Sequence, residues 1–370
     1  MAKMLMCGNE VIGEAAIQAG CSFYAGYPIT PQNELPQYMS FRMPDCGGTF
    51  IQAESELAAI NLVFGAAVAG ARAMTSSSSP GISLKQEGIS YLAACQLPAV
   101  IVNMMRGGPG LGNIAPSQAD YFQATRGGGH GDYRTIVLAP STVEEAWGLT
   151  QLAFDLADEY RNPAMILGDG ILGQMMEPVE AVKRNFHLKA VNDSRLISQK
   201  PWALTGCRGR KPNVVRSLFL GEGELEELNR MLQMKYNKIK SKEVRFESLY
   251  TEDSDLVVVA YGTTSRIVRS AISKARQQHL HVGMFRPITL WPFPEMQLSK
   301  LAKKARAFLV VEMSAGQMVE DVKLSVLGRR PIHFYGRAGG GVPTEEAIVE
   351  MIKDILKPRS RSRVTHEKDI

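Results

Sequence analysis

Short apolar runs alternate with helical patterns along most of this 370-residue chain. The run PAVIVNMM (residues 98–105) is continuous and rich in Val and Ile, which is typical of a strand buried on both faces. The segment 143–160, VEEAWGLTQLAFDLADEY, has the spacing of an amphipathic helix. Because strands that alternate with helices form a parallel sheet covered on both faces, the pattern predicts an α/β fold.

The alternation fills residues 1–180, which we expect to form the first domain. Its predicted strands are 21–26, 47–52, 73–77, 98–105, 135–140 and 162–169. Its predicted helices are 9–20, 31–43, 54–71, 82–96 and 143–160. From residue 254 to 356 the alternation resumes, which predicts a second and smaller α/β domain.

Residues 181–253 interrupt the alternation and are expected to be a linker segment. Within it, apolar residues at three- and four-residue intervals predict one long amphipathic helix that packs on the body or on a partner. The stripe consists of Leu225, Leu228, Leu232, Tyr236 and Ile239. The basic tail 357–370 is expected to be disordered.

Composition excludes several classes of protein. Hydrophobic residues make up 45% of the chain, but none of the apolar runs reaches the ~20 residues of a membrane-spanning helix. The first residues meet Gly and Glu too early for a signal peptide, so we expect a cytoplasmic protein. A net charge of +5 is mild for this length and does not predict a nucleic-acid-binding surface.

The five cysteines are scattered, without any C-x-x-C pair. They are Cys7, Cys21, Cys46, Cys95 and Cys207. A zinc site or an iron–sulfur cluster needs closely grouped thiolates, so no metal site is expected in this chain. We expect buried or half-buried free thiols. If the protein takes part in redox chemistry, its metal must lie on another chain.

Ligands of open α/β sheets bind beyond the carboxyl ends of the strands, which directs attention to three loops. Thr30 lies between two prolines in YPITP (27–31), where a stiff loop either aims a hydroxyl at a ligand or is only a turn. The serines of SSSSPG (76–81) either bind a ligand or cap a helix. Arg106 opens RGGPGLGN (106–113) and is either a clamp for a carboxylate or a solvated side chain.

Two acidic residues fall at the start of the small-residue helix. The helix dipole explains an acid such as Glu54 in a first turn. Glu56 differs, because apolar residues follow it on the same helical face, and a carboxyl group on a buried face should have a raised pKa. Such a group can share a proton with a cofactor nitrogen.

Two other patterns are weaker. The sequence Gly168-Asp169-Gly170 with Asn192 has the approximate spacing of a thiamine diphosphate–magnesium motif. The residues before Asn192 do not give a clear helix followed by a strand, so we interpret Asp169 as closing a strand in a turn. A lone histidine in a glycine-rich loop, His130, is more often structural than catalytic.

The loops together resemble a family. AGYPITPQNEL, the helix IQAESELAAINLVFGAAVAGARAMTSSSSPGISL, VNMMRGGPGLGN and FRPITLWPFP are similar to the alpha subunit of 2-oxoacid:ferredoxin oxidoreductases. The resemblance covers about residues 5–356. It implies a pyrimidine-binding domain of a thiamine diphosphate enzyme, followed by a domain like the C-terminal domain of transketolase.

The resemblance also implies roles for single residues. Glu56 matches the family glutamate that exchanges a proton with the aminopyrimidine N1′ of the cofactor. Thr30 and Arg106 match residues that face the substrate and hold its carboxylate, and Pro28 and Ile29 fall where the family contacts the cofactor. The acyl group passes to coenzyme A and the electrons pass to ferredoxin.

The same resemblance implies partner chains. A beta subunit carries the diphosphate and Mg²⁺ half of the site, a ferredoxin-like subunit carries the iron–sulfur clusters, and a gamma subunit completes the complex. A self-sufficient thiamine decarboxylase would need a second cofactor-binding domain, for which 370 residues leave no room. A non-catalytic assembly subunit is the other alternative, and the intact Thr30, Glu56 and Arg106 argue against it.

The glycine-rich loops bear on the substrate. The run RGGPGLGNIAPSQADYFQATRGGGHGDYR is most similar to the branched-chain (3-methyl-2-oxobutanoate) type. Leu111 and Ile114 predict an apolar lining suited to an aliphatic tail. Arg126 and Arg134 are the objection, because either one could meet the second carboxylate of 2-oxoglutarate. A 2-oxoglutarate or another 2-oxoacid enzyme, such as an aryl one, therefore stays open.

Overall fold

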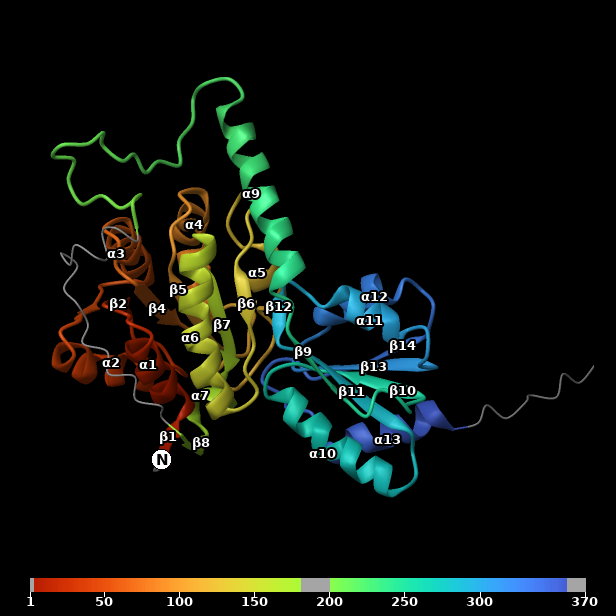
Figure 1. Ribbon diagram of the computed structural model, residues 1–370. Helices are drawn as coiled ribbons and strands as arrows, with labels where there is room; N and C mark the ends of the chain where they lie inside the picture. Colours follow the sequence, from red (N-terminus) through yellow and green to blue (C-terminus); the bar gives the residue numbers. More distant parts are fainter. Residues whose placement is uncertain (1–2, 181–199, 358–370) are drawn as a thin grey trace, which may run out of the picture.

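The computed structural model describes residues 3–180 and 200–357, and these form two sheets with their helices (Figure 1). The tail that we expected to be disordered lies, from residue 358 on, outside these ranges, as does Asn192. Within the described ranges, no helix combines the length and the apolar character needed to cross a membrane.

The first sheet has seven strands in the order β12-β6-β7-β5-β4-β2-β3. All neighbours are parallel except β12, which runs antiparallel to β6. Every residue of β5 and β7 is buried, so both faces of the sheet are covered, as the apolar runs predicted. The strands are β2 (Phe23–Gly26), β3 (Thr49–Gln52), β4 (Ala73–Ser77), β5 (Val100–Met105), β6 (Ile136–Leu138), β7 (Ala164–Asp169) and β12 (Thr289–Trp291).

Seven helices of the described residues accompany this sheet, and five of them pack in two groups. One group places α1 against α2 and α6, and the other places α3 against α4. The helices are α1 (Gly8–Gln18), α2 (Glu34–Asp45), α3 (Glu56–Val68), α4 (Ser79–Ala94), α5 (Tyr121–Arg126), α6 (Val143–Tyr160) and α7 (Gly170–Gln174). A two-stranded ribbon of β1 (Met4–Cys7) and β8 (Met176–Val179), which the sequence patterns did not indicate, joins the two ends of this region.

The second sheet has five strands in the order β14-β13-β10-β11-β9. Its strands are β9 (Phe246–Leu249), β10 (Leu256–Val259), β11 (Val282–Pro287), β13 (Ala307–Glu312) and β14 (Ile332–Gly336). Only β9 is antiparallel to its neighbour, β11. The accompanying helices are α10 (Thr264–Gln277), α11 (Glu295–Leu301), α12 (Met318–Val326) and α13 (Glu345–Leu356). This arrangement confirms the expected second α/β unit.

The long helix α9 (Glu224–Lys242) runs from beyond the first sheet down to the junction of the two sheets (Figure 1). Four residues of the predicted stripe are buried, and Leu225, at 49% exposed, is not. Tyr236 packs edge-on against Trp291, with ring centroids 5.6 Å apart. The helix therefore packs back on the body of the chain.

Strand pairing crosses the domain bounds that the sequence patterns predicted. Strand β12 lies within residues 254–356 but pairs with β6 of the first sheet, and β9 lies within residues 181–253 but pairs with β11 of the second. Each of the two strands hydrogen-bonds the backbone N–H and C=O groups at the edge of a sheet. This pairing explains why a short strand can join a sheet outside the domain that its place in the sequence predicted.

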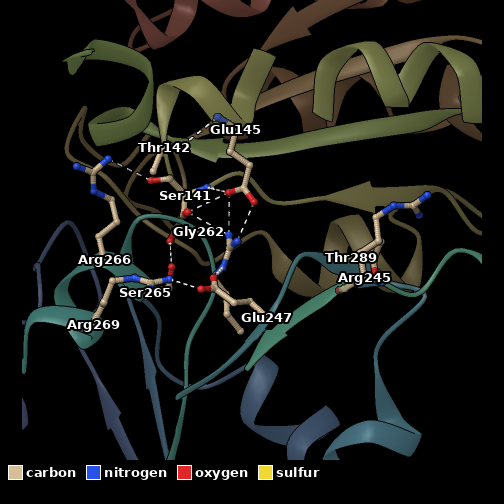
Figure 2. Close-up of polar contacts among 11 residues, drawn as sticks. Ser141, Thr142, Glu145, Arg245, Glu247, Gly262, Ser265, Arg266, Arg269 and Thr289 are labelled. Carbon is tan, nitrogen blue, oxygen red and sulfur yellow. Dashed lines mark hydrogen bonds and ion pairs between the residues drawn. The ribbon is translucent and has the colours of Figure 1, made fainter. Parts of the chain in front are cut away.

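A buried arginine joins the two units. Arg286 in β11 is 5% exposed, and its guanidinium donates two hydrogen bonds of 2.8 Å to the carboxylate of Glu145 at the start of α6. Its Nε donates to Glu247 of β9 at 2.9 Å. Figure 2 shows Ser141 and Glu145 from the first unit close to Glu247 from the second. The network therefore fixes the second sheet against the first.

Candidate functional site

Glu56 is the first residue of α3, and its side chain is turned inward. Ser55 caps the helix, with its hydroxyl accepting from the Ala58 backbone at 3.1 Å, so Glu54 lies before the helix and is exposed. Glu56 is 6% exposed. Its helical neighbours Ala59 and Ile60 are fully buried. The prediction that Glu56 occupies a buried face is confirmed, and no described residue hydrogen-bonds its carboxylate.

The first turn of α4 lies against this carboxylate. A Cβ atom added to Gly81 would stand 2.5 Å from Oε1 of Glu56 and closer still to the hydroxyl of Ser77. Such distances are impossible without movement, so only a glycine at position 81 lets the helix approach the carboxyl group this closely. The run SSSSPG thus supplies the wall beside Glu56, and Ser78 stands at the N-cap position of α4 without a capping hydrogen bond from its side chain.

Arg106 follows β5 and is 7% exposed, which rejects the alternative of a solvated surface arginine. Its Nη1 donates to the carbonyl of Thr30 at 3.0 Å, and its Nη2 donates to that of Leu111 at 2.9 Å. Its backbone N–H donates to the Ser79 hydroxyl at 3.0 Å. Among the described residues, Arg106 has no carboxylate partner, and its buried Nε has no hydrogen-bond acceptor.

The YPITP loop lies on the other side of Arg106. Thr30 is half-buried, and its hydroxyl accepts from the side chain of Asn33 at 3.2 Å. Pro28 is exposed and Ile29 is half-buried. Gln32, which is fully buried, accepts from the Ser76 hydroxyl at 2.5 Å and so ties this loop to the end of β4.

The segments that follow β2, β3, β4 and β5 therefore meet around the first turn of α4. They bring together Thr30, Glu56 and Arg106, which lie far apart in the sequence. Three buried polar atoms there have no partner in the described ranges: Nε of Arg106 and the hydroxyls of Ser77 and Ser78. Arg106, which has no carboxylate partner among the described residues, and Glu56, whose carboxylate has no hydrogen-bond partner among them, both lie at this turn, which fits a ligand that carries an anion and a protonatable nitrogen.

Other candidates lie outside this group. Arg126 pairs with Asp321 at 3.2 Å, and Arg134 donates to the carbonyls of Arg126 and Tyr133. His130 is exposed. Asp169 ends β7 and caps α7, accepting from the backbone of Ile171 and Leu172, which agrees with its interpretation as a strand-closing residue.

The described residues contain no group of three or more His, Cys, Asp or Glu side chains placed to hold a metal ion. All five cysteines are free thiols. Cys7, Cys21 and Cys95 are buried and Cys46 is half-buried, as expected, but Cys207 is exposed because it lies in the irregular segment before α9.

Sequence patterns missed three residues of this site. Gln32 and Ser79 act through hydrogen bonds between loops, which no spacing rule reveals. Lys85 is fully buried on α4, although its position in SLKQEG resembles an ordinary solvated lysine. The only available signal was its four-residue spacing from Gly81, on the same helical face.

Two family models match the chain. Residues 14–234 match the family described as pyruvate flavodoxin/ferredoxin oxidoreductase, thiamine diphosphate-binding. Residues 254–348 match the core domain II of pyruvate:ferredoxin oxidoreductase.

Two relatives are similar to this chain over nearly its whole length. The ketoisovalerate oxidoreductase subunit VorB of Methanothermobacter marburgensis is 49% identical, over 96% of this chain and 98% of that protein. The 2-oxoglutarate synthase subunit KorA of Methanothermobacter thermautotrophicus is 36% identical, over 93% of this chain and 96% of that protein.

Solved structures agree with these matches. The 2-oxoglutarate:ferredoxin oxidoreductase from Magnetococcus marinus superposes with a TM-score of 0.83 at 27% identity, over 95% of this chain and 65% of that chain. A split-gene transketolase shares the fold, with a TM-score of 0.58 at 12% identity, over 95% of this chain and 98% of that chain. The chain therefore belongs to the 2-oxoacid:ferredoxin oxidoreductases, a family of multi-subunit enzymes that use thiamine diphosphate and iron–sulfur clusters.

Proposed function

We propose that this chain is the alpha-type subunit of a branched-chain 2-oxoacid:ferredoxin oxidoreductase, which converts a substrate such as 3-methyl-2-oxobutanoate and coenzyme A to acyl-CoA and CO₂. The observation that carries the proposal is that buried Glu56 and buried Arg106, which has no carboxylate partner among the described residues, both lie at the first turn of α4. The site supplies a proton-exchanging group and a cation for a carboxylate, but no metal ligands among the described residues.

Thiamine diphosphate, when bound, supplies the carbon nucleophile and holds the electrons released on decarboxylation. The residues of this chain bind and orient. Glu56 exchanges a proton with N1′ of the aminopyrimidine, which its free, buried carboxyl group favours. Pro28 and Ile29 hold the YPITP loop against the cofactor, and Thr30 faces the substrate. Arg106 binds the substrate carboxylate through those guanidinium N–H groups that do not donate to the carbonyls of Thr30 and Leu111.

The remaining parts of the reaction belong to other chains in this proposal. A beta subunit binds Mg²⁺ and the diphosphate, and a ferredoxin-like subunit carries the clusters, with a gamma subunit completing the complex. The lack of a metal-ligand cluster in the described residues and the scattered cysteines support this division. We also propose that the complex is cytoplasmic, and that residues 1–180 and 254–356 act as the pyrimidine-binding and transketolase C-terminal-like domains.

The substrate preference rests on three observations. The ketoisovalerate relatives are more similar to this chain than the 2-oxoglutarate relatives, at 49% against 35–38% identity. Arg126 and Arg134, which were the objection from the sequence, are occupied by Asp321 and by backbone carbonyls. Near Arg106 the glycine-rich loop instead offers apolar Leu111 and Ile114, which are 79% and 65% exposed.

Purification of the complex from its natural source tests the assembly. We expect a beta subunit and an iron–sulfur subunit to co-purify, and a chain that purifies without partners and is active alone would contradict the proposal. Assays of the complex with coenzyme A test the substrate. A kcat/KM that is higher for 2-oxoglutarate than for 3-methyl-2-oxobutanoate would exclude the branched-chain assignment while leaving the role of Glu56 intact.

A further inference from the structure

Lys85 is fully buried on α4, close to the candidate site. Its Nζ donates to the Thr75 hydroxyl at 2.7 Å and to the Ser76 carbonyl at 3.4 Å. In the part of the chain that the structure describes, no carboxylate lies within the 4.0 Å of an ion pair. A lysine is almost never fully buried unless it is paired, so its position here needs an explanation.

The face of α4 that carries Lys85 is the face that packs on α3. A Cβ atom on Gly88 would stand 2.6 Å from the side chain of Ile60, and one on Gly81 would stand 2.5 Å from Oε1 of Glu56. Gly81, Lys85 and Gly88 are spaced by four and three residues, so they share one side of the helix. Lys85 therefore lies between two points of contact with α3, one of which is the carboxylate of Glu56.

We propose that Lys85 is a positioning residue for Glu56, whose buried ammonium group stabilises the Glu56 carboxylate each time Glu56 gives its proton to a ligand nitrogen. This inference rests on the proposed function of Glu56. The proton moves between the Glu56 oxygen and the nitrogen of the ligand, and returns by the same route. Lys85 forms and breaks no covalent bond, and it contributes through charge.

The electrostatics support this pairing. Burial lowers the pKa of Lys85 to about 7, and the charge of Glu56 acts in the opposite direction. The other elements around the ammonium group contribute hydroxyls and carbonyls from β4, and Tyr24 of β2, which bonds the Ser76 hydroxyl, stays neutral because burial raises its pKa. The charge of Glu56 therefore favours the ammonium form of Lys85, and the ammonium in turn favours the carboxylate form of Glu56.

The first test measures the pH dependence of kcat/KM in the assembled complex. Lys85→Met removes the charge and keeps the volume, and Lys85→Gln is a second uncharged variant with a polar end for Thr75. A nearby cation depresses a carboxyl pKa by about one to three units. We therefore expect the acid limb of the kcat/KM profile, where activity falls as pH is lowered, to move to higher pH by about one unit or more in both variants. Lys85→Arg, which keeps the charge, should have the same acid limb as the parent complex.

Lys235 provides a matched control. It lies on α9, burial and the charge of Arg161 lower its pKa to about 7, and its Nζ donates to the Arg161 carbonyl at 3.0 Å. Lys235→Met removes a half-buried charge whose pKa is also lowered but which lies on another helix, so the acid limb should stay where it is in the parent. An unchanged limb in both uncharged Lys85 variants, or an equal shift in Lys235→Met, overturns the proposal.

A second test needs no catalysis. The unfolding equilibrium of the full chain is measured at neutral pH for the parent, Lys85→Met, Glu56→Gln and the double variant. A coupling of about tenfold or more in the equilibrium constant is expected, since tenfold corresponds to one pKa unit. If the effects of Lys85→Met and Glu56→Gln on the free energy of unfolding are additive, the Lys85 proposal is wrong, even if Glu56→Gln is inactive. Coupling in a chain whose Glu56→Gln variant is fully active supports the pair and overturns the catalytic role of Glu56 instead.

Discussion

The guanidinium of Arg106 donates a hydrogen bond to the carbonyl oxygen of Thr30, at 3.0 Å. A second bond, to the Leu111 carbonyl at 2.9 Å, reaches the glycine-rich loop on the other side. Arg106 thus hydrogen-bonds both of the loops that we propose to face the substrate. The same guanidinium is proposed to bind the substrate carboxylate. A variant at position 106 should therefore lose both the carboxylate contact and the link between the two loops.

Arg106→Ala should raise KM for the 2-oxo acid by about 10- to 100-fold, because a hydrogen bond to a charged group contributes about 1.5–3 kcal/mol. Arg106→Lys should recover only part of this loss, since a point charge cannot bind the carboxylate and hold both loops. Arg126→Ala is the matched control, because Arg126 pairs with Asp321 outside the site, and its KM should equal that of the parent. An unchanged KM in both Arg106 variants would remove Arg106 from the substrate site.

Glu56→Gln should preserve assembly but lower turnover by ~10²–10⁴-fold, the usual contribution of a general acid or base. Glu54→Gln, two residues earlier and exposed, should have a mild effect. Steady-state kcat of the two complexes compares them directly. Equal effects, or a larger effect at Glu54, would show that the proton-exchanging residue has been assigned wrongly.

Gly81→Ala should lower kcat by about 10-fold or more, because its Cβ atom would stand 2.5 Å from Oε1 of Glu56 and a displacement of about 1 Å can cost up to 10²-fold. Gly148→Ala is the control, since a Cβ atom there meets no atom within 4 Å on helix α6. It should leave kcat unchanged and stabilise the fold by about 0.5–1 kcal/mol in denaturant unfolding. Full activity of Gly81→Ala would mean that the carboxylate of Glu56 needs no fixed position.

Arg286→Met should lower the free energy of unfolding by about 3 kcal/mol at neutral pH, because it removes the buried cation shared by Glu145 and Glu247. Lys304→Met, which removes an exposed partner of Glu252, should change it by no more than ~1 kcal/mol. Urea unfolding of the full chain measures both. Similar values for the two variants would contradict a buried contact between the two sheets.

The same contact predicts a pH dependence. Burial opposes the ionisation of Glu145, but the hydrogen bonds and charge of Arg286 outweigh it and hold the pKa of Glu145 below its usual range. A carboxyl group with a lowered folded-state pKa stabilises the fold above its unfolded pKa of about 4.3, and this stabilisation is lost as pH falls through the folded value. The difference in stability between the parent and Arg286→Met should therefore shrink below about pH 4. A constant difference down to pH 3 would rule out this ionisation as its source.

Local patterns in the sequence were sufficient for the alternation of strands and helices, for the two α/β units and for the buried face of α3. These features depend on the periodicity of neighbouring residues, so burial of Glu56 beside Ala59 and Ile60 was predictable from spacing alone. The positions of YPITP and RGGPGLGN at strand ends were predictable for the same reason, since parallel strands end at one edge of a sheet. The resemblance of those loops to a known family likewise depends only on the order of their residues.

The tertiary structure alone decided which distant groups meet. Strands β9 and β12 are too short to have a clear period, and each pairs across a bound that the sequence pattern had placed. Whether Arg106 is solvated or buried depends on the carbonyls of Thr30 and Leu111, which only the packed loops bring within hydrogen-bond distance. Lys85 shows the same limit, because its burial between β4 and α3 comes from contacts nine or more residues away and not from its helical neighbours.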